Sequence, residues 1–236
     1  MKKPFMGLFM LLFAFQSNAQ QITWQCSNVK VDNAPAFITV WDQFMNSDLG
    51  KKMTPHAVFE FLNTNSTNSA THQLCWFSDD PAKLEAQSYS ILAGSAKFSE
   101  LFPVVNTYIN NVEEISNYMG QALIADPGDF SLRYSVLYGM NVKDPASYAA
   151  AFTKMKAAFD KRESRGTVEL HEIIAGGEKG VTHVVIVRAP SMAEWLSGRN
   201  DFIASKAFQE FAAATRPISD IIETTSGTPV QFYNVQ

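Results

Sequence analysis

Cysteine is nearly absent from this sequence, with Cys26 and Cys75 the only two in 236 residues. Two thiols cannot form a scaffold of several disulfides or a zinc site with four thiolate ligands. The four histidines form no compact metal-binding motif such as HExxH, so we predict no metal site. Two alternatives remain for the cysteines: one disulfide bridge, or two buried free thiols that act as small apolar side chains.

An excess of basic residues is also lacking. The chain has 19 Lys and Arg against 23 Asp and Glu, which gives a formal net charge of −4. Proteins that bind nucleic acids usually present a basic face, so we predict no nucleic-acid partner. Hydrophobic residues make up 46% of the chain, enough for a substantial core in one large domain or two small ones.

Long apolar runs are missing after the first 20 residues. The N-terminus has basic Lys2 and Lys3, an apolar stretch over 6–15, and small residues at Ser17 and Ala19. This pattern is typical of a cleaved signal peptide, and the stretch is short for a membrane span. We expect residues 1–19 to be removed and the protein to be exported to the periplasm or outside the cell, without a membrane contact after cleavage. The alternative is a retained anchor.

Motifs for phosphates, dinucleotides and nucleophilic catalysis are absent as well. There is no G-x-G-x-x-G, P-loop or serine nucleophile elbow. The glycine-rich "AGGEKG" at 175–180 lies between two expected strands, so we interpret it as a hairpin turn.

What the sequence does contain is an internal repeat with an offset of 111 residues. "THQLCWF" at 71–77 matches "THVVIVR" at 182–188, and Phe37, Trp41 and Phe44 match Tyr148, Phe152 and Met155. The latter spacing places large apolar residues on one helix face. Because the matched positions follow in order along the chain, we predict a tandem duplication.

Each copy reads as the element order β-α-β-β-α-β. Alternating apolar residues indicate strands, and Asp144-Pro145 is a typical helix start. The domains are therefore expected at 20–126 and 131–236, with 127–130 as the linker. The expected strands cover 22–31, 56–62, 71–77, 119–124, 132–142, 167–174, 181–187 and 228–235. The expected helices cover 35–45, 81–117, 145–163 and 190–214, the last with a break near Ala204-Ser205.

With this order, the chain resembles the dimeric α+β-barrel superfamily, and in particular its antibiotic-biosynthesis-monooxygenase-like branch. The resemblance lies in "THVVIVRAPSMAEW", "SKAFQEFAAATRPISDII" and "TPVQFYNV". It implies an α+β fold in which two ferredoxin-like repeats pack as an intramolecular pseudo-dimeric barrel, as a monomer or a higher oligomer. It also implies that the first and third strands are neighbours, which favours a Cys26–Cys75 bridge. The equivalent apolar pair in the second copy is then Leu137 and Ile186.

Two groups of residues are candidates for chemistry. His72 and His183 occupy matching positions at the start of the third strands, while Glu169 and His171 share one strand face. They could carry protons in a cavity, or they could be structural strand-end and solvent-facing residues. The candidate ligand-binding residues are aromatic or lie at strand ends: Trp76, Tyr134, Tyr138, Arg133 and Arg188.

Three functions remain open at this point. The chain is first expected to bind a small hydrophobic or aromatic molecule, without a predicted cofactor but with haem as an option. The second hypothesis is a cofactor-independent monooxygenase or haem-modifying enzyme, with His72, His183 or His171 in proton transfer. The third is a structural or interaction module without a ligand. No catalytic motif in the sequence decides among them.

Overall fold

The computed structural model describes residues 22–65, 68–93, 103, 106–107, 110–126, 131–162 and 166–235. The expected signal peptide, linker and part of the second expected helix therefore lie outside the described residues. No helix among these residues is long and apolar enough to cross a membrane.

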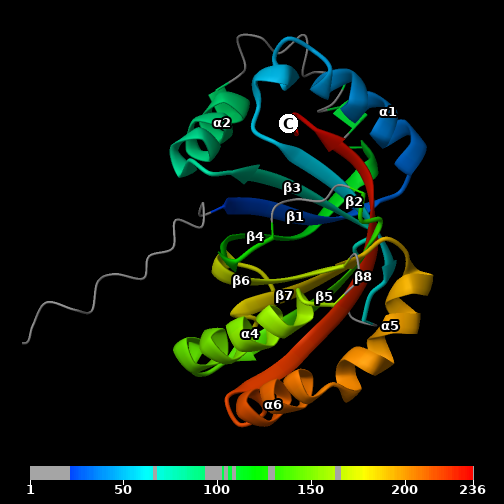
Figure 1. Ribbon diagram of the computed structural model, residues 1–236. Coiled ribbons are helices and arrows are strands. Elements are labelled where there is room, and N and C mark those ends of the chain that lie inside the picture. Colours follow the sequence, from blue (N-terminus) through cyan, green and yellow to red (C-terminus); the bar gives the residue numbers. More distant parts are fainter. Residues whose placement is uncertain are drawn as a thin grey trace, which may run out of the picture.

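The centre of the molecule is a closed antiparallel barrel of eight strands (Figure 1). The strand order around the barrel is β1-β3-β2-β8-β5-β7-β6-β4. Closure leaves no unpaired sheet edge. The strands are β1 (Thr23–Val31), β2 (His56–Asn63), β3 (His72–Ser78), β4 (Val112–Ile124), β5 (Tyr134–Val142), β6 (Thr167–Gly176), β7 (His183–Ala189) and β8 (Ser219–Tyr233).

Helices cover the outside of the barrel in two groups, with α1 and α2 on one side and α4, α5 and α6 on the other (Figure 1). Their bounds are α1 (Ala34–Met45), α2 (Pro81–Ala93), α4 (Pro145–Phe159), α5 (Met192–Ala204) and α6 (Lys206–Thr215), with a short 3-10 helix at Gly50–Lys52. The predicted start at Asp144-Pro145 is confirmed: the Asp144 carboxylate accepts a hydrogen bond from Ser147 N. The predicted break is confirmed by Ser205, which caps α6.

Two long strands join the halves of the chain. β4 pairs with β1 and with β6, and β8 pairs with β5 and with β2. The order is therefore β4-β1-β3-β2 in the first half and β8-β5-β7-β6 in the second, closed by the β2–β8 and β4–β6 pairs. The result is a mixed α+β fold in which neither half closes the barrel by itself.

The two faces of the sheet form different cores. On the outer face, apolar side chains pack against the helices in one cluster around Phe37 and Trp41 and another around Phe152. On the inner face, a smaller cluster contains Trp24, Cys26 and Cys75. Because successive strand residues point to opposite faces, each strand contributes to both an outer core and the barrel interior.

The disulfide prediction is confirmed, and the alternative of two free thiols is wrong. Cys26 pairs with Cys75 in the β1–β3 register, and their sulfur atoms are bonded. The matching pair in the second half, Leu137 and Ile186, is also in register between β5 and β7. The bridge therefore replaces an apolar cross-strand contact at one of two corresponding positions.

Three element boundaries were predicted wrongly. The helix expected to reach Asn117 cannot do so, because β4 begins at Val112 and pairs with Val31 at that point. The last strand begins at Ser219 instead of Thr228, since Ile221 and Thr224 are β-branched residues and pair with β5. In addition, α4 ends at Phe159 and not at Glu163, which lies outside the described residues.

The expected hairpin turn at 175–180 is confirmed between β6 and β7. Gly176, Gly177 and Gly180 have φ angles of 73°, 82° and 89°. Side chains with a Cβ atom rarely adopt these values, so glycine allows the chain to reverse here.

Candidate functional site: the barrel cavity

The barrel interior contains a cavity with two adjoining chambers. The volume open to the centres of water-sized molecules is about 70 Å³ in one chamber and about 30 Å³ in the other. A single water needs about 10–15 Å³ by this measure, so the space suits a few waters or a small ring system. The chambers share the wall residues Phe61, Gln73, Tyr118, Leu137 and Val184.

The larger space, here called the disulfide-side chamber, is mainly apolar. Besides the shared residues, its wall consists of Trp24, Cys26, Phe59, Cys75, Phe77, Ser135, His171, Ile186, Arg188 and Gly227. Aromatic rings and the disulfide thus surround the few polar groups, which is the usual composition of a small-molecule pocket.

A chain of hydrogen bonds lies in the wall of this chamber. The Trp24 indole Nε1 donates to His171 Nδ1 over 3.0 Å, and His171 Nε2 is 3.0 Å from Glu169 Oε2. Arg188 Nη2 lies 3.4 Å from the Glu169 carboxylate. Trp24, Glu169 and His171 are all buried. The four side chains come from β1, β6 and β7, so only the folded barrel brings them together.

The indole determines which nitrogen of His171 carries the hydrogen. An indole N–H can only donate, so Nδ1 must be the acceptor and Nε2 must carry the hydrogen that Glu169 accepts. Both ring nitrogens of His171 are therefore hydrogen-bonded in this arrangement. Burial alone would raise the pKa of Glu169, but Arg188 and the hydrogen bond from His171 outweigh it and hold the pKa below its ordinary value.

Gly120 provides the space for the Trp24 ring. A Cβ atom at this position would lie 2.4 Å from Trp24 Cζ2 and 2.2 Å from the Glu172 carbonyl oxygen, both closer than atoms can approach. The glycine thus allows β4 to pass close to the indole that binds His171. Sequence reasoning did not find this role of Trp24, because the two residues are separated by 147 positions.

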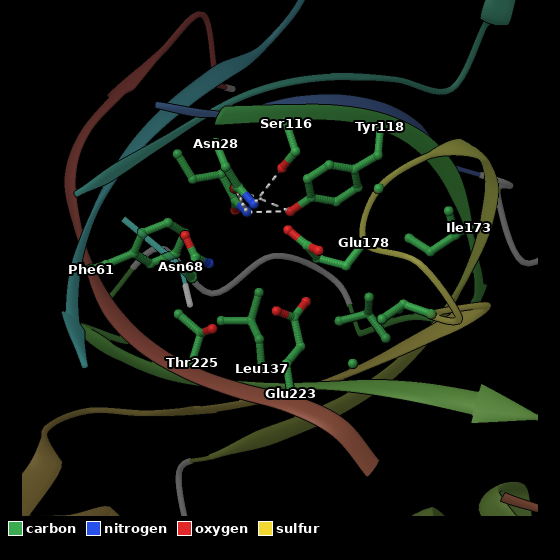
Figure 2. Close-up of a pocket in the computed structure, with 15 residues that line it drawn as sticks. Asn28, Phe61, Asn68, Ser116, Tyr118, Leu137, Ile173, Glu178, Glu223 and Thr225 are labelled. Atoms are coloured by element: carbon green, nitrogen blue, oxygen red, sulfur yellow. Dashed lines mark hydrogen bonds between the residues drawn. The ribbon is translucent and has the colours of Figure 1, made fainter. Parts of the chain in front are cut away.

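The smaller space, here called the hairpin-side chamber, has a mixed wall with more polar groups than the disulfide-side chamber (Figure 2). Gln73 Nε2 donates to Asn28 Oδ1 over 3.0 Å and also to the Tyr118 hydroxyl, and Asn28 Nδ2 donates to Ser116 Oγ over 3.3 Å. Glu178 and Glu223 point into the same chamber opposite Tyr118 (Figure 2). Burial raises the pKa of Tyr118 above its ordinary value.

His72 and His183 lie away from this cavity. They alternate along β3 and β7 with Gln73 and Val184, whose side chains line the barrel interior, so they face the helices. In each case the ring Nδ1 is hydrogen-bonded to the preceding threonine, over 2.8 Å for Thr71 and 2.9 Å for Thr182. Burial lowers the pKa of both histidines.

The two threonines explain the repeated Thr-His pair. Thr71 Oγ1 accepts from Val31 N, and Thr182 Oγ1 accepts from Val142 N, each over 2.9 Å. These contacts join the end of the first strand to the start of the third in both halves. The repeated Thr-His motif thus lies at the contact between the first and third strands of each half.

His56 was not a candidate in the sequence, yet it is fully buried on the outer face. Trp41 Nε1 donates to His56 Nε2 over 3.0 Å, and the Trp76 ring centre is 3.9 Å away. Burial lowers the pKa of His56 to about 3. The sequence signal that could have found His56 is the high number of aromatic residues. A buried imidazole nitrogen needs a hydrogen-bond partner, and a tryptophan indole N–H can supply it.

Of the five candidate ligand-binding residues, Arg188 alone lines the cavity just described. Trp76 and Tyr138 belong to the outer cores, and Tyr134 shares their face by alternation. The guanidinium of Arg133 donates to the Pro229 carbonyl over 3.2 Å. Among the residues that the structure describes, no group of three or more Cys, His, Asp or Glu could hold a metal ion.

Comparison with known proteins shows the fold. No family model and no curated protein matches this sequence. An anthrone oxidase-like protein is 10% identical with a TM-score of 0.60, and the match covers 93% of this chain and 95% of that one. A proposed monooxygenase from Lactobacillus acidophilus is 8% identical with a TM-score of 0.57, over 90% and 96% of the chains. A proposed chlorite dismutase is 11% identical with a TM-score of 0.51, over 89% and 95%. The chain has an α+β-barrel fold similar to theirs.

Haem does not fit the barrel cavity. Haem needs a large pocket and an axial ligand with an open lone pair. In the barrel wall, both ring nitrogens of His171 are engaged. On the helix-side face, His56 Nε2 accepts from Trp41, while the buried Nε2 of His183 has no hydrogen-bond partner among the described residues. The barrel cavity is also too small for a macrocycle of this size.

Proposed function

We propose that this protein is an oxygenase-like enzyme that acts without haem on a small aromatic substrate in the disulfide-side chamber. The observation that carries the proposal is the buried Trp24–His171–Glu169–Arg188 chain in the wall of an aromatic-lined cavity. A carboxylate–imidazole pair at a cavity is a typical arrangement for taking a proton from a substrate. The similarity to an anthrone oxidase-like protein and a proposed monooxygenase supports the same class of chemistry.

The proposed reaction starts with an activated C–H or O–H bond on an aromatic ring. For anthrone, a base removes a proton from the CH2 group between two aryl rings, and the resulting anion is oxidised by O2. The balance is one anthrone and one O2 to one anthraquinone and one water. The protein has to bind the ring, accept the proton and exclude bulk water from the anion.

In this proposal His171 Nδ1 is the proton acceptor. Substrate binding displaces the indole N–H of Trp24, and the substrate C–H takes its place. Glu169 then stabilises the imidazolium through Nε2, and Arg188 keeps Glu169 ionised before the proton arrives. In this proposal, Trp24 Nε1 stays hydrogen-bonded to His171 Nδ1 until a substrate binds.

A second candidate is a carrier that binds an aromatic molecule without changing it. One observation favours it: both ring nitrogens of His171 already have partners, so the base has no open lone pair in this state. Binding of a ring compound without turnover would decide for the carrier.

Turnover of anthrone under air tests the enzyme hypothesis. Absorbance reports anthraquinone formation, and the reaction in buffer alone gives the background rate. We expect His171→Gln to lower the enzymatic rate by about 100-fold, within the range of general base catalysis. Glu169→Gln, a positioning variant, should lower it less and change its pH profile. Tyr134→Phe is the matched control, because Tyr134 lies on the outer face. A wild-type rate equal to the background would refute the proposal.

We also propose that the two halves arose by tandem duplication and that the protein is exported. The duplication is supported by the matched Thr-His contacts and by Cys26–Cys75 and Leu137–Ile186 at equivalent register positions. Export is supported by the disulfide, since such bonds persist in oxidising compartments. Intact-mass measurement of protein from its own host tests this: the mass should lack residues 1–19 and increase by two hydrogens on reduction.

A further inference from the structure

Polar side chains gather on the inner face of the sheet at one side of the disulfide-side chamber. Ser135 on β5 pairs in register with Arg188 on β7, and Arg188 pairs with Thr167 on β6. Ser135 and Arg188 line the chamber. Thr167 faces the same way, because its neighbour Val168 belongs to the outer core. The three adjacent strands therefore carry a row of polar side chains toward the barrel interior.

The hydroxyl groups of this row lack hydrogen-bond partners. Ser135 is only 5% exposed, yet its Oγ makes no hydrogen bond in the part of the chain that the structure describes. Thr167 Oγ1 is buried and likewise has no partner within the described ranges. A buried hydroxyl has lost its hydrogen bonds to bulk water and needs another group to replace them. Because Ser135 lines the chamber, its partner has to come from what the chamber holds.

Arg188 also has donors to spare. Among the residues that the structure describes, its guanidinium binds only the Glu169 carboxylate, through Nη2 at 3.4 Å. Charge-assisted hydrogen bonds are ordinarily about 2.7–2.9 Å long, so Glu169 does not saturate this group. An arginine has five N–H donors in a rigid plane and stays charged, which leaves the hydrogens on Nε and Nη1 for a ligand.

Gly227 leaves space beside these donors. It pairs with Ser135 from β8, the other neighbouring strand, and it lines the chamber. A Cβ atom added here would lie 2.8 Å from the Glu60 carbonyl oxygen, so a larger residue does not fit without a shift. Since glycine has no side chain, the space next to Ser135 stays open to a ligand atom.

We propose that Arg188 and Ser135 form a subsite for a negatively charged oxygen of the ring compound in the disulfide-side chamber. A charged acceptor there would receive hydrogen bonds from the guanidinium and from the serine hydroxyl, and both side chains are otherwise short of partners. The inference rests on the proposed function for the position of the ring. It adds the substrate class: an aromatic compound with an ionisable oxygen, such as a phenol or an enolisable ketone.

The position of the subsite suits the proposed reaction. His171 and Arg188 both line the chamber and both contact Glu169, so the base and the guanidinium belong to one wall. When the C–H bond of anthrone breaks, the proton goes to His171 Nδ1. The bonding electrons move into the ring system, and the negative charge collects on the carbonyl oxygen. A guanidinium and a hydroxyl at that oxygen stabilise the anion as it forms.

4-Nitrophenol tests the subsite, because it ionises near neutral pH and its anion absorbs visible light. Its pKa is measured by absorbance titration, free and with an excess of the full chain. We expect binding to lower the pKa of the phenol by about one unit or more, a tenfold preference for the phenolate. Ser135→Ala should reduce this preference about threefold or more, because one hydrogen bond to the charged oxygen is lost.

A pair of variants tests whether the guanidinium binds the anion directly. Arg188→Gln should abolish the preference, but it also leaves the buried Glu169 carboxylate unpaired, which costs stability and repels anions. The double variant Glu169→Gln, Arg188→Gln removes both charges at once. Direct binding by Arg188 predicts that the preference stays lost in the double variant. Repulsion by an unpaired Glu169 predicts that it returns.

Matched controls come from outside the chamber. Arg133→Gln removes an arginine that donates to the Pro229 carbonyl and lines neither chamber. Ser226→Ala removes a buried serine hydroxyl that is hydrogen-bonded to Asn63 and lines neither chamber. Both variants should keep the phenolate preference of the wild type. Circular dichroism spectra and thermal midpoints confirm that each variant is folded.

The outcomes distinguish this inference from the proposed function. The subsite is wrong if 4-nitrophenol does not bind, or if it binds with an unchanged pKa. It is also wrong if the preference is intact in folded Ser135→Ala or returns in the double variant. These results leave anthrone turnover, and with it the enzyme hypothesis, untouched. A phenolate preference that depends on Ser135 and Arg188, together with no anthrone turnover above background, would support the subsite in a carrier.

Discussion

The histidines on the two faces of the barrel sheet differ in what surrounds them. On the outer face, His56, His72 and His183 are packed under helices, and burial lowers their pKa values. On the inner face, His171 lies between an indole and a carboxylate at the wall of a cavity. On the outer face, burial outweighs the charges of Glu60 and Glu172, which raise the pKa values of His72 and His183. On the inner face, His171 is directly hydrogen-bonded to the Glu169 carboxylate, which can stabilise a positive charge on the ring. The difference shows that the partners of a buried histidine, and not its burial, decide whether it can act as a base.

The largest expected difference between the faces concerns packing. Phe152 is fully buried in the outer core, so Phe152→Ala should destabilise the protein by about 3–5 kcal/mol. Phe59 lines the inner chamber, where truncation enlarges an existing space, so Phe59→Ala should cost clearly less. Urea unfolding measures both free energies. Equal costs would mean that the inner chamber is as tightly packed as the outer core.

The next largest effect concerns the disulfide on the inner wall. The bridge joins residues 49 positions apart, and its removal in a Cys26→Ser, Cys75→Ser variant should cost about 2–4 kcal/mol. The corresponding pair in the second half, Leu137 and Ile186, is an apolar contact without a crosslink. Leu137→Val is therefore the control, and it should lower the unfolding free energy by about 1 kcal/mol. Thermal and urea unfolding of the two variants would contradict this ranking if Leu137→Val were the more damaging change.

A third effect, on the outer face, depends on pH. The folded pKa of His56, about 3, is below its unfolded value of 6.5, so the folded state binds fewer protons. The stability from the neutral ring is complete above pH 6.5 and is lost as pH falls toward 3, by about 2 kcal/mol at pH 5. His56→Gln should flatten the decline in unfolding free energy between pH 7 and pH 5. An unchanged slope would show that His72 and His183 cause the decline instead.

The smallest expected effects are of opposite sign. Gly120→Ala brings a Cβ against Trp24 and the Glu172 carbonyl, so it should destabilise by about 1 kcal/mol or more and weaken the Trp24–His171 contact. At Gly198 in α5 nothing lies within 4 Å of an added Cβ, so Gly198→Ala should stabilise by about 0.5–1 kcal/mol. Thermal midpoints and tryptophan fluorescence measure both. A stabilising Gly120→Ala would show that the indole is not closely seated.

Much of the fold could be predicted from local patterns. Alternation located most strands, the Asp144-Pro145 pair located a helix start, and the offset of 111 residues placed Cys26–Cys75 and Leu137–Ile186 at equivalent positions. The start of β4 was missed because the polar residues of "VEEISN" hide the strand period at a position where β1 supplies the hydrogen bonds. Pairing with a distant strand decided that segment, and local propensity did not.

The candidate site was harder to predict. Glu169 and His171 could be placed on one strand face, because the period of a strand is two residues. The sequence did not show whether that face was the barrel interior or the surface. Residues of both faces recur with the same two-residue spacing along each strand, so the spacing does not tell the faces apart. Trp76 and Tyr138 were equally apolar candidates, yet they pack under the helices.

The sequence by itself determined the order of elements, the matched halves and the residues that share a face, because these depend on spacing along one chain. Only the tertiary structure decided which face encloses a cavity. The barrel closes through the β2–β8 and β4–β6 pairs, which join distant segments. Closure is what places Trp24 next to His171 and Glu223 opposite Tyr118, and no local pattern encodes those contacts.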